Sequence, residues 1–333
     1  MSNPLRPPVS LGSDLTIDPP IWLAPMEGVT DISFRGLIIS TNPGGVGAAC
    51  TEFCRVTDHP MPASFLELAL GPVRNDAAVG IQLMGNQPEA IAETANRAAE
   101  IGAKFVDLNF GCPAPRVFQH CAGSALLADP PLLEKVVKYV ANICPVPVTA
   151  KIRSGIEDDA GIEDIAKRIE QSGASALAIH ARLKTDRYTD PSSWARIERA
   201  VAAVSIPVIG NGSAHTAVDI EKMFNETGCA GVMVARGALE NPWIFSDRLA
   251  LLQKRALKLR TTTEVAAWLA RYKTRMEAGG ANQNQALGRL KQSAKAMATA
   301  GLLDKETVAK SLRLKTTFSF LEALRRSLAP PNS

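Results

Sequence analysis

Eight short apolar runs recur at a regular interval between residues 21 and 237. Each run is rich in branched side chains and mostly uninterrupted, as expected for a parallel strand buried on both faces. Helical sequences such as 88–102 and 162–174 separate the runs. The alternation predicts an α/β fold, a (β/α)8 TIM barrel over residues 21–248, with a doubly wound open sheet as the alternative. The runs lie at 21–26, 46–53, 79–85, 105–110, 146–152, 176–181, 206–212 and 231–237.

The flanking parts of the chain differ from this repeat. Residues 1–20 contain five prolines and are expected to form an irregular lead-in. After about residue 248 the strand pattern stops, and three segments at 264–278, 285–301 and 306–328 have helical periodicity with basic outer faces. We therefore expect an all-helical C-terminal domain at 249–333.

The formal net charge of +4 is distributed unevenly along the 333 residues. Residues 249–333 hold 16 Lys and Arg but only 5 Asp and Glu, a balance of +11, whereas the rest of the chain has a balance of −7. An acidic body with a basic C-terminal segment indicates a polyanion-binding module. A solvated helical surface is the simpler alternative.

Cysteine usage and hydropathy indicate a cytoplasmic protein. No apolar run is long enough for a membrane span, and the N-terminus does not have the pattern of a secretory signal. Six cysteines are spread thinly, with no CxxC pair, so a disulfide framework is not expected. Cys50 and Cys54 do not have the partners that a zinc site requires, and no metal is expected.

Polar residues accumulate where the apolar runs end. In a barrel of this kind, functional groups come from the carboxyl ends of the strands and the loops that follow, so the pattern predicts a polar pocket at one rim. The residues are Pro25, Met26, Glu52, Gln82, Asn109, Cys112, Lys151, Arg153, His180, Arg182, Asn211, Gly212, Arg236 and Gly237.

The last two runs end in glycine-bearing turns at 211–213 and 235–238. Glycines let backbone N–H groups approach a phosphate, and TIM barrels often bind phosphate after their last two strands. Arg236 could add a bidentate contact. Either turn taken alone has a sequence that is common in turns without a ligand, but the occurrence of both after the last two runs favours a phosphate site.

Three side chains at strand ends have a chemical and a structural interpretation. Lys151 interrupts an apolar run and needs an anionic partner, either a ligand or a neighbour such as Asp107. His180 taken alone would be a hydrogen-bonded structural residue, and only its polar neighbours favour a role in ligand binding. Cys112, held between Gly111 and Pro113, could be a proton donor, a nucleophile or a small buried hydrophobe.

Several motifs taken together resemble the tRNA-dihydrouridine synthases. They are LAPMEGVTDISFR at 23–35, TEFCRVTD at 51–58, IQLMG at 81–85, VDLNFGCP at 106–113, KIR at 151–153, IHARLKTDRY at 179–188, IGNG at 209–212 and VARGALENPWIF at 234–245. They run in family order over about three-quarters of the chain. MEGV, TEFCRVTD and the RLKQ at 289–292 are more similar to the bacterial branch that modifies position 16 of tRNA.

The resemblance implies an FMN-bearing barrel, NADPH as the reductant and a helical domain that binds tRNA, with no obligate protein partner and a monomeric state expected. Cys112 would be the catalytic acid. Residues implied to hold FMN are Pro25, Met26, Glu27, Gln82, Lys151, His180, Asn211, Gly212, Ser213, Ala235 and Arg236. Residues implied to line the uridine pocket or its mouth are Asn109, Arg153, Arg182, Lys184 and Tyr188. Arg289 and Lys291 are implied to meet tRNA phosphates.

The implied reaction is the reduction of a uridine in the D-loop of tRNA. A flipped base would stack on the reduced flavin, which would deliver a hydride to C6 while Cys112 protonates C5. The rivals are a small-molecule ene or pyrimidine reductase using FMN, which the basic C-terminal segment disfavours, and a non-catalytic RNA-binding barrel.

One segment departs from the family pattern. After Cys112 and Pro113 the chain reads APRVFQHCAGSALLADP, with Pro115 and Phe118 at places that are usually polar and only Gly123 kept from a glycine-rich run. Because this loop follows the cysteine, the departure concerns the ordering of the loop and the position of the substrate.

Overall fold

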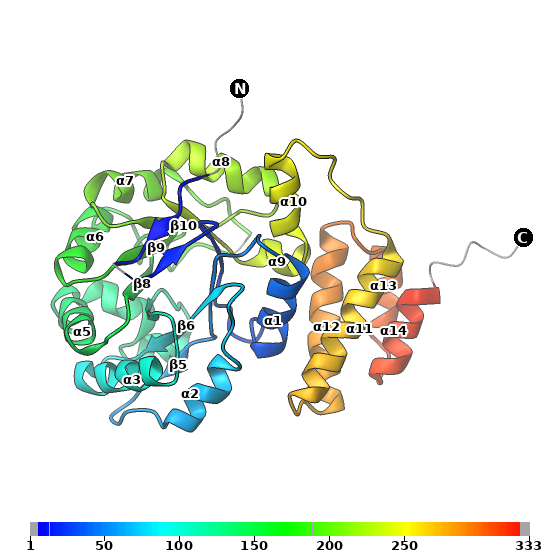
Figure 1. Ribbon diagram of the computed structural model, residues 1–333, viewed down its shortest axis with the longest axis horizontal. Helices are drawn as coiled ribbons and strands as arrows, with labels where there is room; N and C mark the ends of the chain where they lie inside the picture. Colours follow the sequence, from blue (N-terminus) through cyan, green and yellow to red (C-terminus); the bar gives the residue numbers. More distant parts are fainter. Residues whose placement is uncertain (1–5, 13, 188, 327–333) are drawn as a thin grey trace, which may run out of the picture.

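The computed structural model describes residues 6–12, 14–187 and 189–326 and has a closed parallel barrel with a helical bundle beside it (Figure 1). The barrel closes because β3 pairs with both β4 and β11, and β4 pairs in turn with β6. The TIM-barrel prediction is thus confirmed, and the open sheet is excluded. The barrel strands are β3 (Ile21–Leu23), β4 (Ala48–Cys50), β6 (Ala78–Met84), β7 (Val106–Phe110), β8 (Val148–Arg153), β9 (Ala176–His180), β10 (Val208–Asn211) and β11 (Gly231–Val234).

Helices that alternate with these strands form the outer layer. They are α1 (Ile32–Thr41), α2 (Ala63–Leu70), α3 (Pro88–Glu100), α5 (Pro130–Ile143), α6 (Ile162–Gln171), α7 (Ala195–Ala203), α8 (Ala217–Thr227) and α10 (Ile244–Leu252). Short elements sit in the loops at the carboxyl ends of the strands: β5 (Cys54–Arg55), α4 (Pro115–Gln119), the 3-10 helix η1 (Gly123–Ala128) and α9 (Arg236–Glu240).

Within the described ranges no helix combines the length and apolar character needed to cross a membrane.

The barrel interior changes from apolar to polar along its axis. Trp22, Phe105 and Met233 belong to a buried apolar cluster that fills one end. Closer to the carboxyl ends of the strands, Gln82 and Asp107 are each only 1% exposed. Polar atoms buried this deeply must pair with one another, so the interior is ordered by hydrogen bonds as well as by packing.

The N-terminal lead-in, expected to be irregular, contains an antiparallel ribbon of β1 (Val9–Ser10) and β2 (Thr16–Ile17). Val9 and Ile17 are buried in the same cluster as Trp22. The ribbon therefore covers the apolar end of the barrel, opposite the loops expected to carry function.

Four helices follow the barrel: α11 (Thr262–Ala278), α12 (Gln283–Thr299), α13 (Lys305–Ser311) and α14 (Thr317–Arg326). The segment 306–328, expected to be helical, contains two helices, because the chain turns between Ser311 and Thr317. The Thr316 hydroxyl accepts a hydrogen bond from the Ser319 amide (3.1 Å), so it caps a new helix rather than continuing the old one. Helix α10 runs across the expected domain boundary at 248/249.

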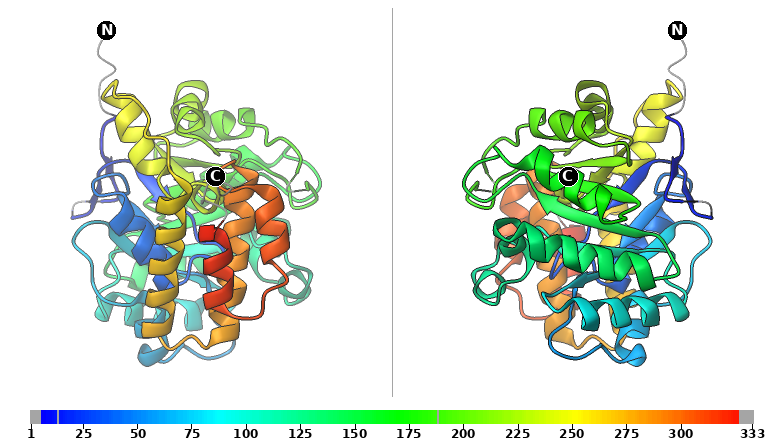
Figure 2. Two further views of the ribbon diagram at one scale, coloured as in Figure 1. Left: turned by 90° about the vertical axis from the view of Figure 1, so that its right-hand side faces the viewer. Right: turned by 90° about the vertical axis from the view of Figure 1, so that its left-hand side faces the viewer.

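An aromatic cluster joins the helical bundle to the barrel, and Figure 2 shows the bundle stacked on that flank. The rings of Trp268 and Tyr272 in α11 pack edge-on against Phe34 of α1, with centroids 6.0 and 5.7 Å apart. The Trp268 indole Nε1 donates to Thr41 Oγ1 (3.0 Å), and its side chain is fully buried. This contact fixes the bundle relative to the barrel rim.

We expect Trp268→Ala to lower the free energy of unfolding by about 3–5 kcal/mol, because the indole leaves a large cavity at the interface. Urea denaturation followed by circular dichroism measures the change. Trp268→Phe, which keeps a ring but loses the Thr41 hydrogen bond, is the matched control and should cost less than half as much. A loss below about 1 kcal/mol for the alanine variant would contradict the role assigned to this cluster.

Candidate active site

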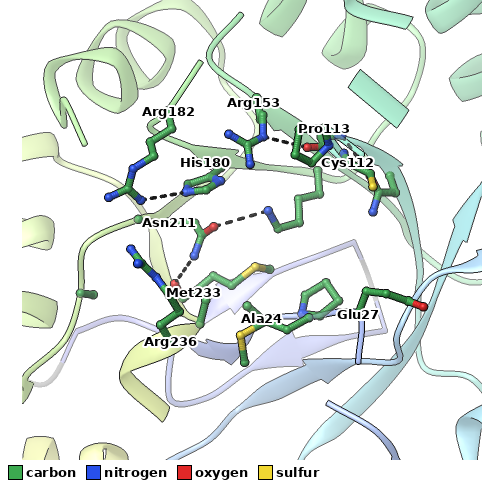
Figure 3. A pocket seen from close by; sticks show the side chains of 18 of the residues that line it. Ala24, Glu27, Cys112, Pro113, Arg153, His180, Arg182, Asn211, Met233 and Arg236 are labelled. Atoms are coloured by element: carbon green, nitrogen blue, oxygen red, sulfur yellow. Dashed lines mark hydrogen bonds between the residues drawn. The ribbon is translucent and has the colours of Figure 1, made fainter. Parts of the chain in front are cut away.

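A cavity of about 390 Å³ opens at the carboxyl ends of the barrel strands (Figure 3). It lies where the strand-end pattern placed a polar pocket. Cys112 lines it, as do Asn109, Arg153 and Arg182. Every residue expected to hold a cofactor also lines it: Pro25, Met26, Glu27, Gln82, Lys151, His180, Asn211, Gly212, Ser213, Ala235 and Arg236.

Four cations line this cavity around His180. Burial keeps the pKa of His180 well below its ordinary value, and nearby Lys151, Arg153, Arg182 and Arg236 lower it further, so the imidazole is neutral. Figure 3 shows Arg182 and Arg236 on the side of the pocket away from Cys112. Among the lining residues only Glu27 is acidic. Electrostatically, the cavity favours an anionic ligand.

Lys151 points into the cavity from β8. Its Nζ donates to Asn211 Oδ1 (3.4 Å), and Asn211 is oriented in turn by donating to the Met233 carbonyl (2.7 Å). Burial lowers the pKa of Lys151 to about 8, against a smaller opposing effect of Asp107. The ion pair with Asp107 considered from the sequence is not among the ion pairs of the described residues. A ligand anion would stabilise the charged ammonium.

The turn after β10 exposes backbone to the cavity. Gly212 has φ of +120° and Ser213 has φ of +53°. A Cβ at Gly212 would lie 3.1 Å from His180 Cδ2, so this position leaves little room for a side chain. The Trp194 indole Nε1 holds the Gly212 carbonyl (2.9 Å). Because Gly212 has no Cβ, a bound anion could approach the backbone of this turn closely.

Cys112 is fixed through its backbone by two neighbours. Asn109 Oδ1 accepts hydrogen bonds from the amides of Gly111 (3.0 Å) and Cys112 (2.9 Å). On the other side, the Ser124 amide and hydroxyl both donate to the Cys112 carbonyl, at 3.1 and 2.9 Å. Gly123, with φ of +60°, has no room for a Cβ, which would lie 2.9 Å from that carbonyl oxygen. The retained glycine of the atypical loop thus permits close packing against the cysteine.

The environment of Cys112 favours the protonated thiol. Burial raises the pKa of the thiol and Glu27 raises it further, while the Ala114 amide, Arg153 and Lys151 act in the opposite direction. A thiol that keeps its proton at neutral pH suits a proton donor and is a poor nucleophile.

Arg153 and Arg182 line the cavity, and their guanidinium groups also brace its loops. Arg153 donates to the carbonyls of Gly111 (2.9 Å) and Leu183 (2.7 Å), which ties the Cys112 loop to the loop after β9. Arg182 donates to the Asp190 carbonyl (2.5 Å) and to Ser213 Oγ (3.2 Å). Both side chains are buried. Their positions are therefore set before any ligand binds.

The atypical loop after the cysteine folds into α4, which Pro115 begins at a position where its missing N–H costs nothing. Lys184 lies over the Phe118 ring, with its Nζ 4.1 Å from the centroid. Lys184, expected to line the uridine pocket or its mouth, thus bridges two loops and is not among the residues that line the cavity. Tyr188, with the same expected role, lies outside the described residues.

The two residues expected to meet tRNA phosphates lie on α12 and are not among the cavity lining. Arg289 forms an ion pair with Asp31, with Nε 3.8 Å from Oδ2, and lies against Gly28 at the barrel rim. The Lys291 ammonium donates to the Leu314 carbonyl (2.7 Å) in the turn between α13 and α14. In this structure both side chains contact the protein itself.

Several lining residues had no assigned role in the sequence interpretation, among them Phe53, His215 and Met233. Phe53 follows a strand, and that position could have identified it. Met233 lies inside an apolar run, where nothing in the sequence separates it from core residues. His215 follows the phosphate-type turn and pairs with Glu240, with Nδ1 2.7 Å from Oε2.

Comparison with known proteins agrees with this geometry. A sequence profile described as "Dihydrouridine synthase (Dus)" matches residues 22–319. The chain belongs to the dihydrouridine synthase family. A relative from Cupriavidus necator named tRNA-dihydrouridine(16) synthase is 40% identical over 232 residues, which is 67% of this chain and 71% of the relative. Relatives of the same name from Pseudomonas syringae pv. tomato and Shewanella oneidensis are 37% and 39% identical, over 70% and 67% of this chain and 75% and 72% of their own.

Among solved structures, histamine dehydrogenase from Rhizobium sp. 4-9 superposes with a TM-score of 0.60. The alignment has 11% identity and covers 81% of this chain and 51% of that protein. At this identity the likeness concerns the fold alone.

The raised pKa of Cys112 predicts slow alkylation. With iodoacetamide at pH 8, we expect Cys112 to react about tenfold more slowly than the exposed Cys121, because the thiolate is the reacting form and Cys112 is also partly buried. Peptide mass spectrometry resolves the two sites in one sample, so Cys121 is the internal control. The rate at Cys112 should rise as pH increases through its raised pKa. Faster reaction at Cys112 than at Cys121 would contradict the assignment.

Proposed function

We propose that this protein reduces uridine 16 of tRNA to 5,6-dihydrouridine, with FMN as its cofactor and NADPH as the reductant. The observation that carries the proposal is one cavity that combines a group of buried cations with a neutral thiol. The family and the names of the relatives support the same reaction. The tRNA substrate favours a cytoplasmic location.

The donor set fits FMN. The phosphate of FMN is an anion, and the cations of the cavity and the Gly212–Ser213 turn could bind it. Arg236, the first residue of α9, lines the same cavity as this turn. Lys151 and the buried amide of Gln82 suit the electron-rich edge of an isoalloxazine ring. The proposed FMN residues are Pro25, Met26, Glu27, Gln82, Lys151, His180, Asn211, Gly212, Ser213, Ala235 and Arg236.

When bound and reduced, FMN supplies the hydride that saturates the pyrimidine. The protein orients the base and supplies the proton. Cys112 Sγ gives its proton to C5 of the uracil ring, and the hydrogen bonds to its backbone hold it in one place while it does so. The resulting thiolate lies near Arg153 and Lys151, both of which favour its negative charge.

Binding of tRNA rests on the charge of the C-terminal helices. With a balance of +11 over residues 249–333, this region attracts a polyanion, and the base must leave its stack to enter the cavity. Asn109, Arg153 and Arg182 are proposed to border the uridine, with Lys184 and Tyr188 at the mouth and Arg289 and Lys291 on the tRNA-facing helix.

Replacing Cys112 with alanine should leave FMN binding intact and lower dihydrouridine formation by about 10²–10⁴-fold, the contribution of a positioned general acid. The measurements are the flavin absorbance of the purified protein and dihydrouridine per tRNA by mass spectrometry. Cys112→Ser keeps the size of the side chain but removes most of its acidity, so it should also be slow. Cys121→Ala is the control and should retain full activity. Undiminished activity in Cys112→Ala would remove the acid role.

The modified position is tested with tRNA transcripts. We expect the protein with FMN and NADPH to form dihydrouridine in an unmodified transcript, and none when U16 alone is replaced by cytidine. Added salt should weaken activity steeply, because phosphate contacts release counterions. Turnover of free uridine at a rate similar to that of the transcript would favour a small-molecule reductase instead.

A further inference from the structure

Asp107 is a buried carboxylate that the proposed reaction does not use. It lies in β7, is 1% exposed, and does not line the active-site cavity. Its Oδ1 accepts a hydrogen bond from Thr149 Oγ1 (2.6 Å), and its Oδ2 accepts one from Gln82 Nε2 (2.7 Å). Burial raises the pKa of Asp107 to about 6, with both hydrogen bonds and Lys151 lowering it, so near pH 7.5 the group is mainly ionised.

An ionised carboxylate can only accept hydrogen bonds, and this fixes the orientation of the amide beside it. Gln82 must turn its NH₂ toward Asp107, so its Oε1 faces the other way. That oxygen accepts from Asn109 Nδ2 (2.8 Å). Asn109 therefore turns its own oxygen toward the Cys112 loop, where Oδ1 accepts from the Gly111 and Cys112 amides.

The chain of hydrogen bonds has one direction because its two ends have one role each. The carboxylate is an acceptor only, and the backbone N–H groups of Gly111 and Cys112 are donors only. Two side-chain amides, each with an acceptor end and a donor end, connect them head to tail. Reversing either amide would place like atoms against each other at both of its ends.

We infer that Asp107 is a positioning residue that acts through Gln82 and Asn109 to hold the backbone of Cys112 and so to present its thiol. The effect of Asp107 on catalysis rests on the proposed function, whereas the effect of Asp107 on the Cys112 loop is independent of that function. The alternative is that Asp107 only balances the charge of Lys151. No ion pair between them occurs in the described part of the chain, where Lys151 Nζ donates to Asn211.

The experiment compares Asp107→Leu with Asp107→Asn in the protein as purified. Leucine has the same branched shape as aspartate, with two methyl groups in place of the two oxygens, and accepts no hydrogen bond, so Gln82 is free to rotate and the Cys112 loop loses its anchor. We expect the ratio of alkylation rates, Cys112 over Cys121, to change by about tenfold in this variant. Asparagine can still accept from Gln82 and can donate to the Thr149 hydroxyl, so it should keep the ratio within about threefold of the parent protein.

Activity gives a second measurement. We expect kcat for dihydrouridine formation to fall about tenfold or more in Asp107→Leu, with a smaller change in KM for tRNA, and Asp107→Asn should restore most of the loss. The alkylation ratio needs neither tRNA nor NADPH. If the parent protein forms no dihydrouridine, the proposed function fails, and the ratio still decides the role of Asp107.

Three outcomes would overturn the inference. The first is an unchanged alkylation ratio in folded Asp107→Leu, as judged by its thermal melting. The second is a loss of kcat in Asp107→Asn equal to the loss in Asp107→Leu, which would assign the effect to charge alone. If Asp107→Leu does not fold, Gln82→Met is used instead, because it removes the middle link of the hydrogen-bond chain and fills the same space. The third outcome is an unchanged alkylation ratio in that variant. A tenfold change there would support the inference.

Discussion

The structure depends on one electrostatic constraint, the crowding of cations around a cavity that is partly shielded from water. Lys151, Arg153, Arg182 and Arg236 all act on the same neutral imidazole of His180. Keeping such groups together is unfavourable unless an anion joins them, because burial removes their hydration. The closed barrel makes this arrangement possible, since its strand ends converge and its hydrogen-bonded interior holds each group in place. Ligand binding would thus relieve a strain that folding creates.

Much of the architecture could be predicted from the sequence because it depends on periodicity. Apolar runs identified the eight strands, and the polar residues at their ends identified the cavity. The turn at Thr316 was missed, since a helical pattern on both sides conceals a local capping bond. The loop-bracing contacts of Arg153 and the role of Asp107 were also missed. Those depend on which side chains meet in three dimensions, and spacing along the chain does not encode that.

The cavity imposes opposing conditions on charge. Its arginines and lysine favour negative groups, whereas burial and Glu27 disfavour a thiolate at Cys112. The thiol is therefore stable as an acid until a nearby acceptor takes its proton. The atypical loop fits this interpretation, because α4 and the Gly123–Ser124 contacts pack around the cysteine without adding another cation to the described cavity lining.

Helix α12 occupies the seam between the two parts of the molecule. It packs against α9, whose first residue lines the cavity, and its Arg289 reaches the rim at Asp31, while Lys291 holds the turn at Leu314. The helix therefore packs both against the short helix at the pocket and against the other helices of the bundle. A change in side-chain volume at these contacts would therefore change the position of the outer helices relative to the pocket. The position of the bundle could thus be altered at residues that do not line the pocket, and the side chains that carry the chemistry would stay the same.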